Sequence, residues 1–454
     1  MNNGTFRTFT FLCLVVIGLL ALSLVPEREI GGYEVKHTDL LADIRTCDAE
    51  EAGLSVPSAA SLSPKALHDT CPAGIVCIED YSDTTGHGMQ PFYEAISRRR
   101  TLGRPVRIAY FGDSFIEGDI LTADLRVLLQ QKFGGCGVGF VDISSPFTKL
   151  RASVSAESHG WTEHNVLEKG NHVPAYLGIS QRYALPAGHA SVELRGSDAF
   201  ARLDSFETAT LYLATRRPLS VGIMSDGRPA GRMSAQGTGR VEALCHEQRA
   251  GQVRFDIDGE NRTICYGVAL EGHEGITLDN FSLRGSSGTP LKSVSESHLK
   301  QMYAVRPYDL VVLQFGLNVA NKKQMKYTGY IAQMKRVIAH FKHCFPGAGI
   351  LVVSIGDRED KHNGRIETIP AIPALVREQQ DMAIADGVAF WNLFEGMGGK
   401  GAMLRMAQAR PAEAGKDYTH INRRGGARIA NKLYKALLHG YEQYEKRNAY
   451  ENHP

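Results

Sequence analysis

The chain has 454 residues, of which 43% are hydrophobic and 22% are charged, so it is long enough to form more than one packed domain. Its 51 lysine and arginine residues nearly balance its 49 aspartate and glutamate residues, which gives a formal net charge of +2. This balance excludes the strong positive field that draws nucleic acid or acidic polymers to a protein, and it favours a small neutral or mixed-charge substrate.

The N-terminus carries an uncharged apolar run at residues 8–25, preceded by Arg7 and followed by Pro26 and Glu27. A helix of this length rises about 27 Å, close to the roughly 30 Å hydrocarbon core of a bilayer. We expect residues 1–25 to be a signal anchor that inserts into lipid of the cytoplasmic membrane and leaves the rest of the chain on the extracytoplasmic, periplasmic side. A cleaved signal peptide and a buried helix are the alternative interpretations, although no clear small-residue cleavage site follows the run.

The next segment, residues 26–100, mixes polar loop with little sustained periodicity and includes a Ser/Pro/Ala-rich stretch. It is interpreted as a stalk and N-terminal extension. None of the eight cysteines has the Cys-x-x-Cys spacing that is typical of zinc or redox sites. Outside the cytoplasm, Cys71 with Cys77 and Cys245 with Cys265 are near enough in sequence to form disulfides, and unpaired buried thiols are the alternative.

Alternating strand and helix patterns begin at residue 106. An apolar strand at residues 106–111 leads through a turn at 112–114 into an amphipathic helix at 120–133. The same pattern returns towards the C-terminus, with strands predicted at 309–315, 349–355 and 388–393 and helices at 327–343, 372–386 and 427–444. This alternation predicts a largely parallel sheet covered by helices on both faces, with ligand chemistry at the carboxyl ends of its strands.

The middle of the chain, residues 145–280, has a different pattern. Apolar and polar side chains alternate with a period of two in segments such as 190–194, 209–214 and 252–257, and glycine-rich turns separate these segments. We therefore expect a β-rich domain, residues 146–278, inserted between two parts of an α/β domain, residues 101–145 and 279–445.

A serine stands on the turn where the first predicted α/β strand ends, in Gly112-Asp113-Ser114. A serine hydroxyl becomes a good nucleophile when a base takes its proton and neighbouring amides hold the developing oxyanion. The helix that follows adds favourable backbone dipoles at its amino end. Ser114 is therefore the candidate nucleophile, and ordinary turn chemistry is the alternative interpretation.

A carboxylate and a histidine lie close together near the C-terminus, in Asp417-Tyr-Thr-His420, just before the terminal helix. A carboxylate three residues before a histidine can orient the imidazole and offset its positive charge, which leaves the other ring nitrogen free to face a serine. Asp417 and His420 are therefore the candidate partners of Ser114. Helix capping by Asp417 or Asn422 is the alternative interpretation.

Two further residues are candidates for an oxyanion hole, together with the backbone amide of Ser114. Asn318 lies in the turn after the strand at 309–315, so its amide can donate from a neighbouring strand end. Gly285 follows an apolar stretch and offers a backbone amide that no side chain obstructs. Glycine turns and capping asparagines are also common structural features.

Taken in order, these segments resemble the four conserved blocks of the SGNH (GDSL-type) hydrolase superfamily. Ser114 matches the serine, Gly285 the glycine, Asn318 the asparagine, and Asp417 with His420 the Asp-x-x-His of the last block. The resemblance covers residues 104–145 and 276–440, and it implies a three-layer α/β/α fold with a parallel central sheet. One departure lies in the third block, where Val319 follows the asparagine in place of the usual aspartate.

A narrower resemblance connects the chain to bacterial peptidoglycan O-acetylesterases. It rests on Gly112-Asp-Ser-Phe-Ile-Glu-Gly-Asp119 with the following Leu-Thr-Ala-Asp-Leu-Arg126, and on Ala389-Phe-Trp391 through Glu395-Gly-Met-Gly-Gly399. In that branch a carbohydrate-binding-module-like β-sandwich interrupts the hydrolase, where this chain has its β-rich segment. The resemblance implies a serine esterase that removes O-acetyl groups from cell-wall glycan through an acetyl-serine intermediate, with no metal and no organic cofactor.

Three other functions are compatible with the same residues. An O-acetyltransferase would use the same triad with a sugar hydroxyl as the acceptor. An esterase could act on other carbohydrate or lipid esters, and a catalytically silent protein could bind glycan through the insertion. A fold and a triad do not dictate the acyl donor or acceptor, so the sequence leaves these alternatives open.

Overall fold

The computed structural model describes residues 28–30, 33–35, 71–82, 86–168, 170–259, 262–362 and 364–452. The chain divides into two compact units, Met1–Ser63 and Pro64–Pro454. In the first, β1 (Arg28–Ile30) and β2 (Tyr33–Val35) pair antiparallel. The anchor predicted at residues 8–25 lies outside the described residues. Among the helices that are described, none combines the length and apolar character needed to cross a membrane.

The second unit contains the predicted parallel sheet, here called the catalytic sheet. Its strand order among the described residues is β14-β4-β15-β16-β19-β3, and only the pairing of β3 with β19 is antiparallel. The strands are β3 (Glu79–Asp80), β4 (Val106–Gly112), β14 (Ile276–Ser282), β15 (Leu310–Gln314), β16 (Gly349–Val353) and β19 (Ala389–Trp391). The predicted strands at 106–111, 309–315, 349–355 and 388–393 are therefore confirmed, with small shifts at their ends.

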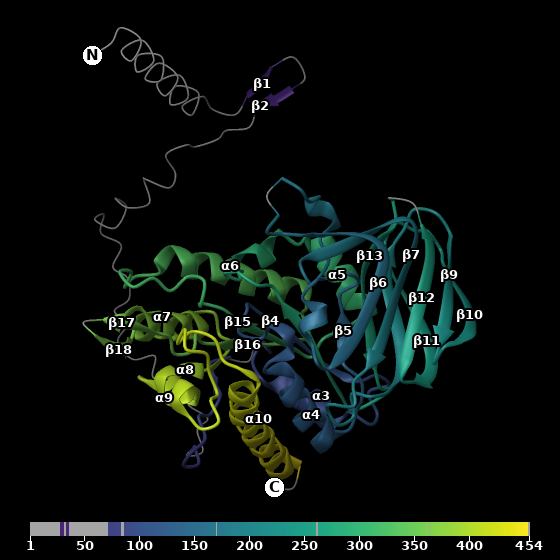
Figure 1. Cartoon of the computed structure of the whole chain (residues 1–454). Helices are drawn as coiled ribbons and strands as arrows, with labels where there is room; N and C mark the ends of the chain where they lie inside the picture. The colour runs from purple at the N-terminus through teal and green to yellow at the C-terminus, as the bar shows by residue number, and fades with distance from the viewer. Residues whose placement is uncertain are drawn as a thin grey trace. The chain divides into compact units, whose positions relative to one another are not determined.

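Helices cover both faces of this sheet (Figure 1). The side chains of a strand point alternately to opposite faces, so Ala109 and Phe111 of β4 enter one core while Ile108 and Tyr110 enter the other. On the first face lie α5 (Glu296–Val305), α6 (Thr328–Cys344) and α7 (Ala371–Ala385), and on the second lie α3 (Gln90–Ser97), α4 (Thr122–Phe133) and α10 (Arg423–Asn452). Burial on both faces explains why these strands are continuous apolar runs.

A second, antiparallel sheet of nine strands within the described residues forms the β-rich region, here called the inserted sheet. Its strands are β5 (Gly139–Val141), β6 (Val154–Asn165), β7 (Arg182–Gly196), β8 (Phe206–Ala214), β9 (Leu219–Ser225), β10 (Arg228–Ala235), β11 (Val241–Ala250), β12 (Gln252–Gly259) and β13 (Ile264–Glu271). The strands β10-β9-β12-β7 form one half of this sheet and β13-β8-β11 the other, and the pairing of Cys265 with Ala184 joins the two halves. Both halves contribute to one core, which includes Leu194, Leu211 and Phe255. The expected β-rich insertion is present.

The positions where the chain passes from one sheet to the other differ from the predicted domain boundaries. The predicted end of the insertion, residue 278, falls inside β14, which pairs along its whole length with β4 of the catalytic sheet. At the other end, β5 precedes residue 146 and pairs with β13 of the inserted sheet. Apolar strands look alike in sequence whichever sheet they join, so only their pairing partners separate β13 from β14.

The N-terminal extension predicted for residues 26–100 is wrong in its last third. The pairing of β3 with β19 and the burial of Phe92, Tyr93 and Ile96 of α3 make this segment part of the second unit. The indole N–H of Trp391 also donates to the Val76 carbonyl oxygen, at 2.9 Å. A strand of two residues and a helix of eight are too short to produce a clear periodic pattern.

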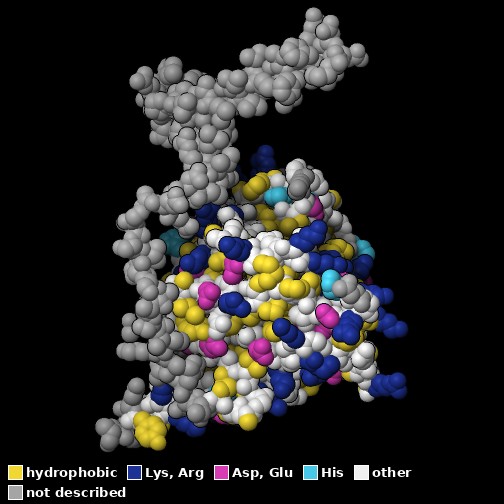
Figure 2. Space-filling model, turned by 90° about the vertical axis from the view of Figure 1, so that its left-hand side faces the viewer, with side chains coloured by type: hydrophobic (Ala, Val, Ile, Leu, Met, Phe, Trp, Pro, Cys, Tyr) yellow, Lys and Arg dark blue, Asp and Glu magenta, His cyan; other side chains and the backbone are white. Residues whose placement is uncertain are grey.

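The remaining elements are short and connect the longer ones. They are α8 (Leu393–Met397), α9 (Ala402–Gln408), the β17 (Glu359–His362) and β18 (Arg365–Thr368) hairpin, and the 3-10 helices η1 (Glu117–Asp119), η2 (Thr148–Leu150), η3 (Pro174–Tyr176) and η4 (Thr289–Ser293). On the face shown in Figure 2, basic and acidic side chains are interspersed with hydrophobic ones.

Of the two candidate disulfides, the structure contains one and not the other. Cys71 and Cys77 form a disulfide. Cys245 is exposed on β11 and Cys265 is buried on β13, and both are free thiols. Each of these two strands pairs with β8, on opposite sides of it, so a strand separates the two thiols.

Candidate active site

The turn that carries Ser114 begins where β4 ends, at the carboxyl edge of the catalytic sheet. Gly112 lies so close to its neighbours that a Cβ there would approach the Ile116 side chain to 2.9 Å and the Gln314 carbonyl oxygen to 3.2 Å, so a larger residue would force its neighbours to shift. The Gly112 carbonyl oxygen accepts a hydrogen bond from the Leu283 amide at 2.9 Å, which brings the loop after β14 against the turn. Ser114 is only partly buried and remains accessible at this edge.

The three candidate triad residues lie in one hydrogen-bonded row. Nε2 of His420 is 3.3 Å from Oγ of Ser114, and Nδ1 of His420 is 2.7 Å from Oδ2 of Asp417. The other carboxyl oxygen of Asp417 accepts from the backbone amides of Thr419 and His420, both at 3.2 Å. The structure thus brings together all three residues that the sequence predicted for the triad.

The electrostatics of Asp417 suit an ionised partner for the imidazole. Partial burial raises the pKa of Asp417, but the hydrogen bonds from His420 and Thr419 lower it, and the resulting pKa lies below the ordinary value. An aspartate held ionised in this way can keep Nδ1 of the histidine protonated, which leaves Nε2 as the acceptor that faces the serine.

Asn318 follows β15 and reaches across to the serine turn. Its Nδ2 donates to Oδ2 of Asp113 at 3.2 Å and to the Ser286 carbonyl oxygen at 3.0 Å. Asp113 and the Ser286 carbonyl oxygen are therefore the groups that hold the asparagine side chain. The contacts connect the serine turn, the glycine loop and the asparagine turn.

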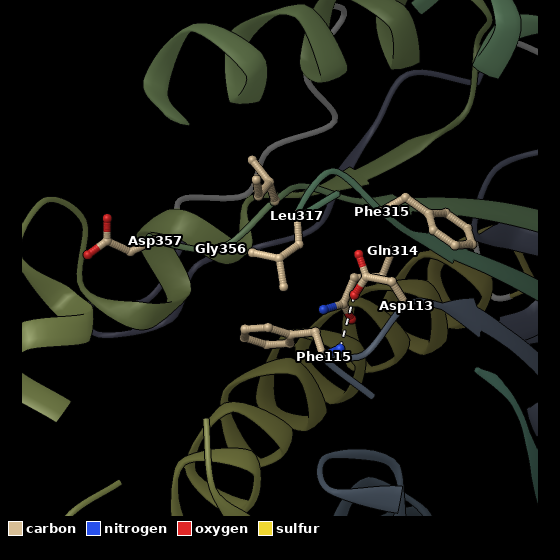
Figure 3. A pocket seen from close by; sticks show the side chains of 8 residues that line it. Asp113, Phe115, Gln314, Phe315, Leu317, Gly356 and Asp357 are labelled. Atoms are coloured by element: carbon tan, nitrogen blue, oxygen red, sulfur yellow. Dashed lines mark hydrogen bonds between the residues drawn. The ribbon is translucent and has the colours of Figure 1, made fainter. Parts of the chain in front are cut away.

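In the sequence Asp113 is only part of a turn, and no local pattern predicts its contact with Asn318. Its carboxyl group also accepts from the Phe115 amide at 3.0 Å (Figure 3). Burial raises the pKa of Asp113 to about 6, opposed by the hydrogen bond from Phe115, the charge of His420 and the hydrogen bond from Asn318. A small hollow behind the site is lined by Asp113, Phe115, Gln314, Phe315, Leu317, Ile355, Gly356 and Asp357.

Gly285 lies on the loop after β14, beside the serine turn. Its φ of +79° is a left-handed conformation that favours glycine, and the space where a Cβ would stand is open. The loop is shaped by a hydrogen bond from the Ser286 amide to the Leu283 carbonyl oxygen, at 3.1 Å. All five predicted site residues therefore lie on loops at the same edge of the catalytic sheet.

A buried polar cluster around Asp119 supports the segment that follows Ser114. Asp119 is fully buried and contacts Arg126 at 3.2 Å and Arg151 at 3.0 Å. Asn280 of β14 donates to Oδ1 of Asp119 and to the Ile116 carbonyl oxygen, both at 2.8 Å. Burial raises the pKa of Asp119, but the two arginines and neighbouring hydroxyls outweigh it and hold the pKa well below the ordinary range. Asp119 and Arg126 both belong to the sequence motif at residues 112–126, whereas Arg151 and Asn280 lie elsewhere in the chain.

Comparisons with known proteins find a similar fold in a solved structure. No family model and no curated protein matches the chain. A solved peptidoglycan O-acetylesterase structure matches with a TM-score of 0.65 and 20% identity, over 80% of this chain and 99% of that one. A salicylyl-acyltransferase from a tetracycline biosynthetic pathway matches with a TM-score of 0.28 and 11% identity, over 63% of this chain and 97% of that one.

A family two carbohydrate esterase from Clostridium thermocellum matches with a TM-score of 0.27 and 11% identity, over 63% of this chain and 100% of that one. Of these three structures, only the peptidoglycan O-acetylesterase is similar enough to compare folds. This chain shares the fold of that structure, so the predicted resemblance to peptidoglycan O-acetylesterases is confirmed at the level of the fold.

Proposed function

We propose that the protein is a serine esterase that removes O-acetyl groups from cell-wall glycan through an acetyl-serine intermediate. The observation that carries this proposal is the row of hydrogen-bonded groups from Asp417 through His420 to Ser114. The row lies at the carboxyl edge of a parallel sheet, where open α/β folds bind their ligands. The choice of an acetylated glycan as substrate is supported by the fold shared with a peptidoglycan O-acetylesterase.

The first half of the reaction transfers the acetyl group to the enzyme. Nε2 of His420 takes the proton from Oγ of Ser114 as Oγ bonds to the acetyl carbonyl carbon, and Asp417 offsets the positive charge that develops on the imidazole. The tetrahedral intermediate then collapses. The bond from its carbon to the glycan oxygen breaks, and His420 returns the proton to that oxygen, so the deacetylated glycan leaves with a free hydroxyl group.

The second half releases acetate. His420 takes a proton from water as the water oxygen bonds to the acetyl carbon, and the bond from that carbon to Oγ breaks with return of the proton to Ser114. The enzyme is restored, and one water is consumed for each acetate formed. Protein side chains and water supply every step.

The oxyanion of both tetrahedral intermediates is assigned to three donors: the backbone amides of Ser114 and Gly285 and Nδ2 of Asn318. Nδ2 now donates to Asp113 and to the Ser286 carbonyl oxygen, so one of its hydrogens must turn towards the oxyanion as that charge forms. Loss of one such donor typically lowers turnover by about 10²- to 10³-fold.

The decisive experiment incubates the purified full chain, in detergent, with O-acetylated peptidoglycan and quantifies free acetate. Ser114→Ala should lower the rate by more than about 10³-fold, because the nucleophile is lost. The control is Ser155→Ala, which changes an exposed serine of the inserted sheet. A Ser114→Ala variant that releases acetate at nearly the wild-type rate contradicts the assignment. Acetyl groups found on an added acceptor glycan, in place of free acetate, would identify a transferase.

We also propose that the protein acts outside the cytoplasm and is held at the membrane by residues 8–25. The apolar run in the sequence supports this location, and so does the Cys71–Cys77 disulfide, because such bonds persist in oxidising compartments. Fractionation of cells followed by alkaline extraction tests the anchor. Recovery of the full-length chain in the soluble cytoplasmic fraction would contradict it.

A further inference from the structure

Arg284 immediately precedes Gly285 on the loop after β14, and its guanidinium group is held by a glutamate of η1, the 3-10 helix that follows the serine turn. Nε of Arg284 donates to Oε2 of Glu117 at 2.9 Å and to Oε1 at 3.1 Å, and Nη2 donates to Oε2. Glu117 stands three residues after Ser114 and is buried. The pair therefore connects the segment after the nucleophile to the loop that supplies a predicted oxyanion donor.

An aromatic ring supports the same guanidinium group. The guanidinium carbon of Arg284 lies 5.5 Å from the centre of the Phe147 ring, within the range of a cation–π contact. The guanidinium carbon of Arg182, at the start of β7, lies 5.6 Å from the same ring. Nη2 of Arg182 also donates to the Ser282 carbonyl oxygen at 3.4 Å. The first loop of the inserted sheet thus reaches the edge of the candidate active site.

Arg284 is nevertheless largely open to solvent. Its side chain is 58% exposed, whereas the side chain of Glu117 is 6% exposed. A guanidinium group has five N–H donors, and its Nη1 contacts no acceptor among the described residues. Binding by a long exposed side chain costs conformational entropy, because the side chain must be ordered. Glu117 and Phe147 already fix the orientation of Arg284, which reduces the cost of binding a ligand.

The position of these donors restricts what they can bind. An acetyl group is small and carries one carbonyl oxygen, which the proposed oxyanion donors already accommodate. The rest of the proposed substrate is a glycan, which is rich in hydroxyl oxygens and, in peptidoglycan, also carries carboxylates. Glu117 balances the charge of Arg284, so the free Nη1 suits either kind of oxygen acceptor.

We propose that Arg284 is a substrate-binding residue that donates from Nη1 to an oxygen of the glycan flanking the acetyl ester. In this arrangement Glu117 and Phe147 are positioning residues, which fix the plane of the guanidinium group. The inference rests on the proposed function and adds to it the residue that distinguishes an acetylated glycan from a simple acetyl ester.

The test compares Arg284→Gln and Arg284→Lys with the wild-type full chain on three substrates: O-acetylated peptidoglycan, acetylated xylan and 4-nitrophenyl acetate. The kcat/KM for the glycans, relative to that for 4-nitrophenyl acetate, should fall by about tenfold, mainly through KM, because a charge-assisted hydrogen bond is lost. A larger fall on peptidoglycan than on xylan identifies a carboxylate as the acceptor, and equal falls identify a hydroxyl oxygen.

The matched control is Arg254→Gln, which removes an arginine paired with Asp256 on the inserted sheet. Labelling of Ser114 by a fluorophosphonate at the wild-type rate shows that each variant retains an intact site. The inference is overturned if the ratio of kcat/KM for the glycans to that for 4-nitrophenyl acetate is unchanged in the Arg284 variants, which includes an equal loss of kcat/KM on all three substrates. Either result leaves the esterase assignment in place. A wild-type enzyme that hydrolyses 4-nitrophenyl acetate but neither glycan overturns both the inference and the proposed substrate.

Discussion

Replacement of Arg306 by methionine should strongly destabilise the protein, because this arginine neutralises two buried carboxylates that join the two sheets. Arg306 is fully buried, and its Nε donates to Oδ2 of Asp279 at 2.8 Å while its Nη2 donates to Oε2 of Glu271 at 3.0 Å. Glu271 ends β13 of the inserted sheet, and Asp279 lies in β14 of the catalytic sheet. Arg107 is the second cation of the cluster and donates to Oε1 of Glu271 at 2.7 Å.

The expected cost follows from the charges left behind. Two arginines and two carboxylates balance, so Arg306→Met leaves one uncompensated buried negative charge, at a cost of about 3–5 kcal/mol. The pKa of Glu271 reflects the same stabilisation, from both arginines together. Burial raises it, but Arg107 and Arg306 outweigh burial and lower it from 4.5 to about 2, equivalent to about 3 kcal/mol. Because the folded-state pKa is lowered, this stabilisation is present above pH 4.5 and is lost as the pH falls towards 2.

Urea unfolding of the full chain at pH 7, followed by far-ultraviolet circular dichroism, measures this cost. Arg228→Met, at an exposed position of β10, is the control and should change stability by less than about 0.5 kcal/mol. The double variant Arg306→Met/Glu271→Gln removes one charge of each sign and should be more stable than Arg306→Met alone. A loss below about 1 kcal/mol for Arg306→Met, or a double variant less stable than the single one, would refute the reasoning.

Three further predictions concern the triad loop, a buried acid and the disulfide. Asp417→Asn should lower kcat for 4-nitrophenyl acetate by at least about 10²-fold, because the imidazole loses its charged partner; a smaller change would contradict the triad. Burial raises the pKa of Glu359 to about 7, so the stability of the wild type to urea should fall as the pH rises from about 4.5 to 7. Glu359→Gln should reduce this fall, and an unchanged pH dependence counts against the burial argument. Replacement of Cys71 and Cys77 by serine should cost about 2 kcal/mol in urea unfolding under oxidising conditions, and no difference from the wild type would show that the bond does not constrain the unfolded chain.

Much of the catalytic sheet could be predicted from local sequence. The strand at 106–111 is a continuous apolar run and the helix at 120–133 is long enough to give a pattern, so local sequence predicts each without knowledge of its partners. The candidate triad could be predicted for a related reason. Asp417 and His420 are three residues apart, and their loop alone allows the 2.7 Å contact. Parallel strands then bring the serine turn and the asparagine turn to one edge.

Other features could not be found in this way. The elements β3 and α3 have too few residues for a periodic pattern, and the assignment of β13 and β14 to different sheets depends on pairing partners. The hydrogen bond between Asn318 and Asp113 joins residues 205 positions apart in sequence, and the hydrogen bond between Arg284 and Glu117 joins residues 167 positions apart. No local pattern signals a hydrogen bond over such a distance.

The sequence by itself indicated the chemistry available at this edge. The proposed nucleophile lies at a strand end, and the proposed base and carboxylate stand three residues apart just before the terminal helix, which are positions that local rules identify. Only the tertiary structure decided how those groups are held. It places Asp113 against Asn318, Glu117 and Phe147 against Arg284, and the buried arginines between the two sheets. The physical reason is that strand and turn preferences act over a few residues, whereas ion pairs and buried hydrogen bonds form between any groups that the packed fold brings together.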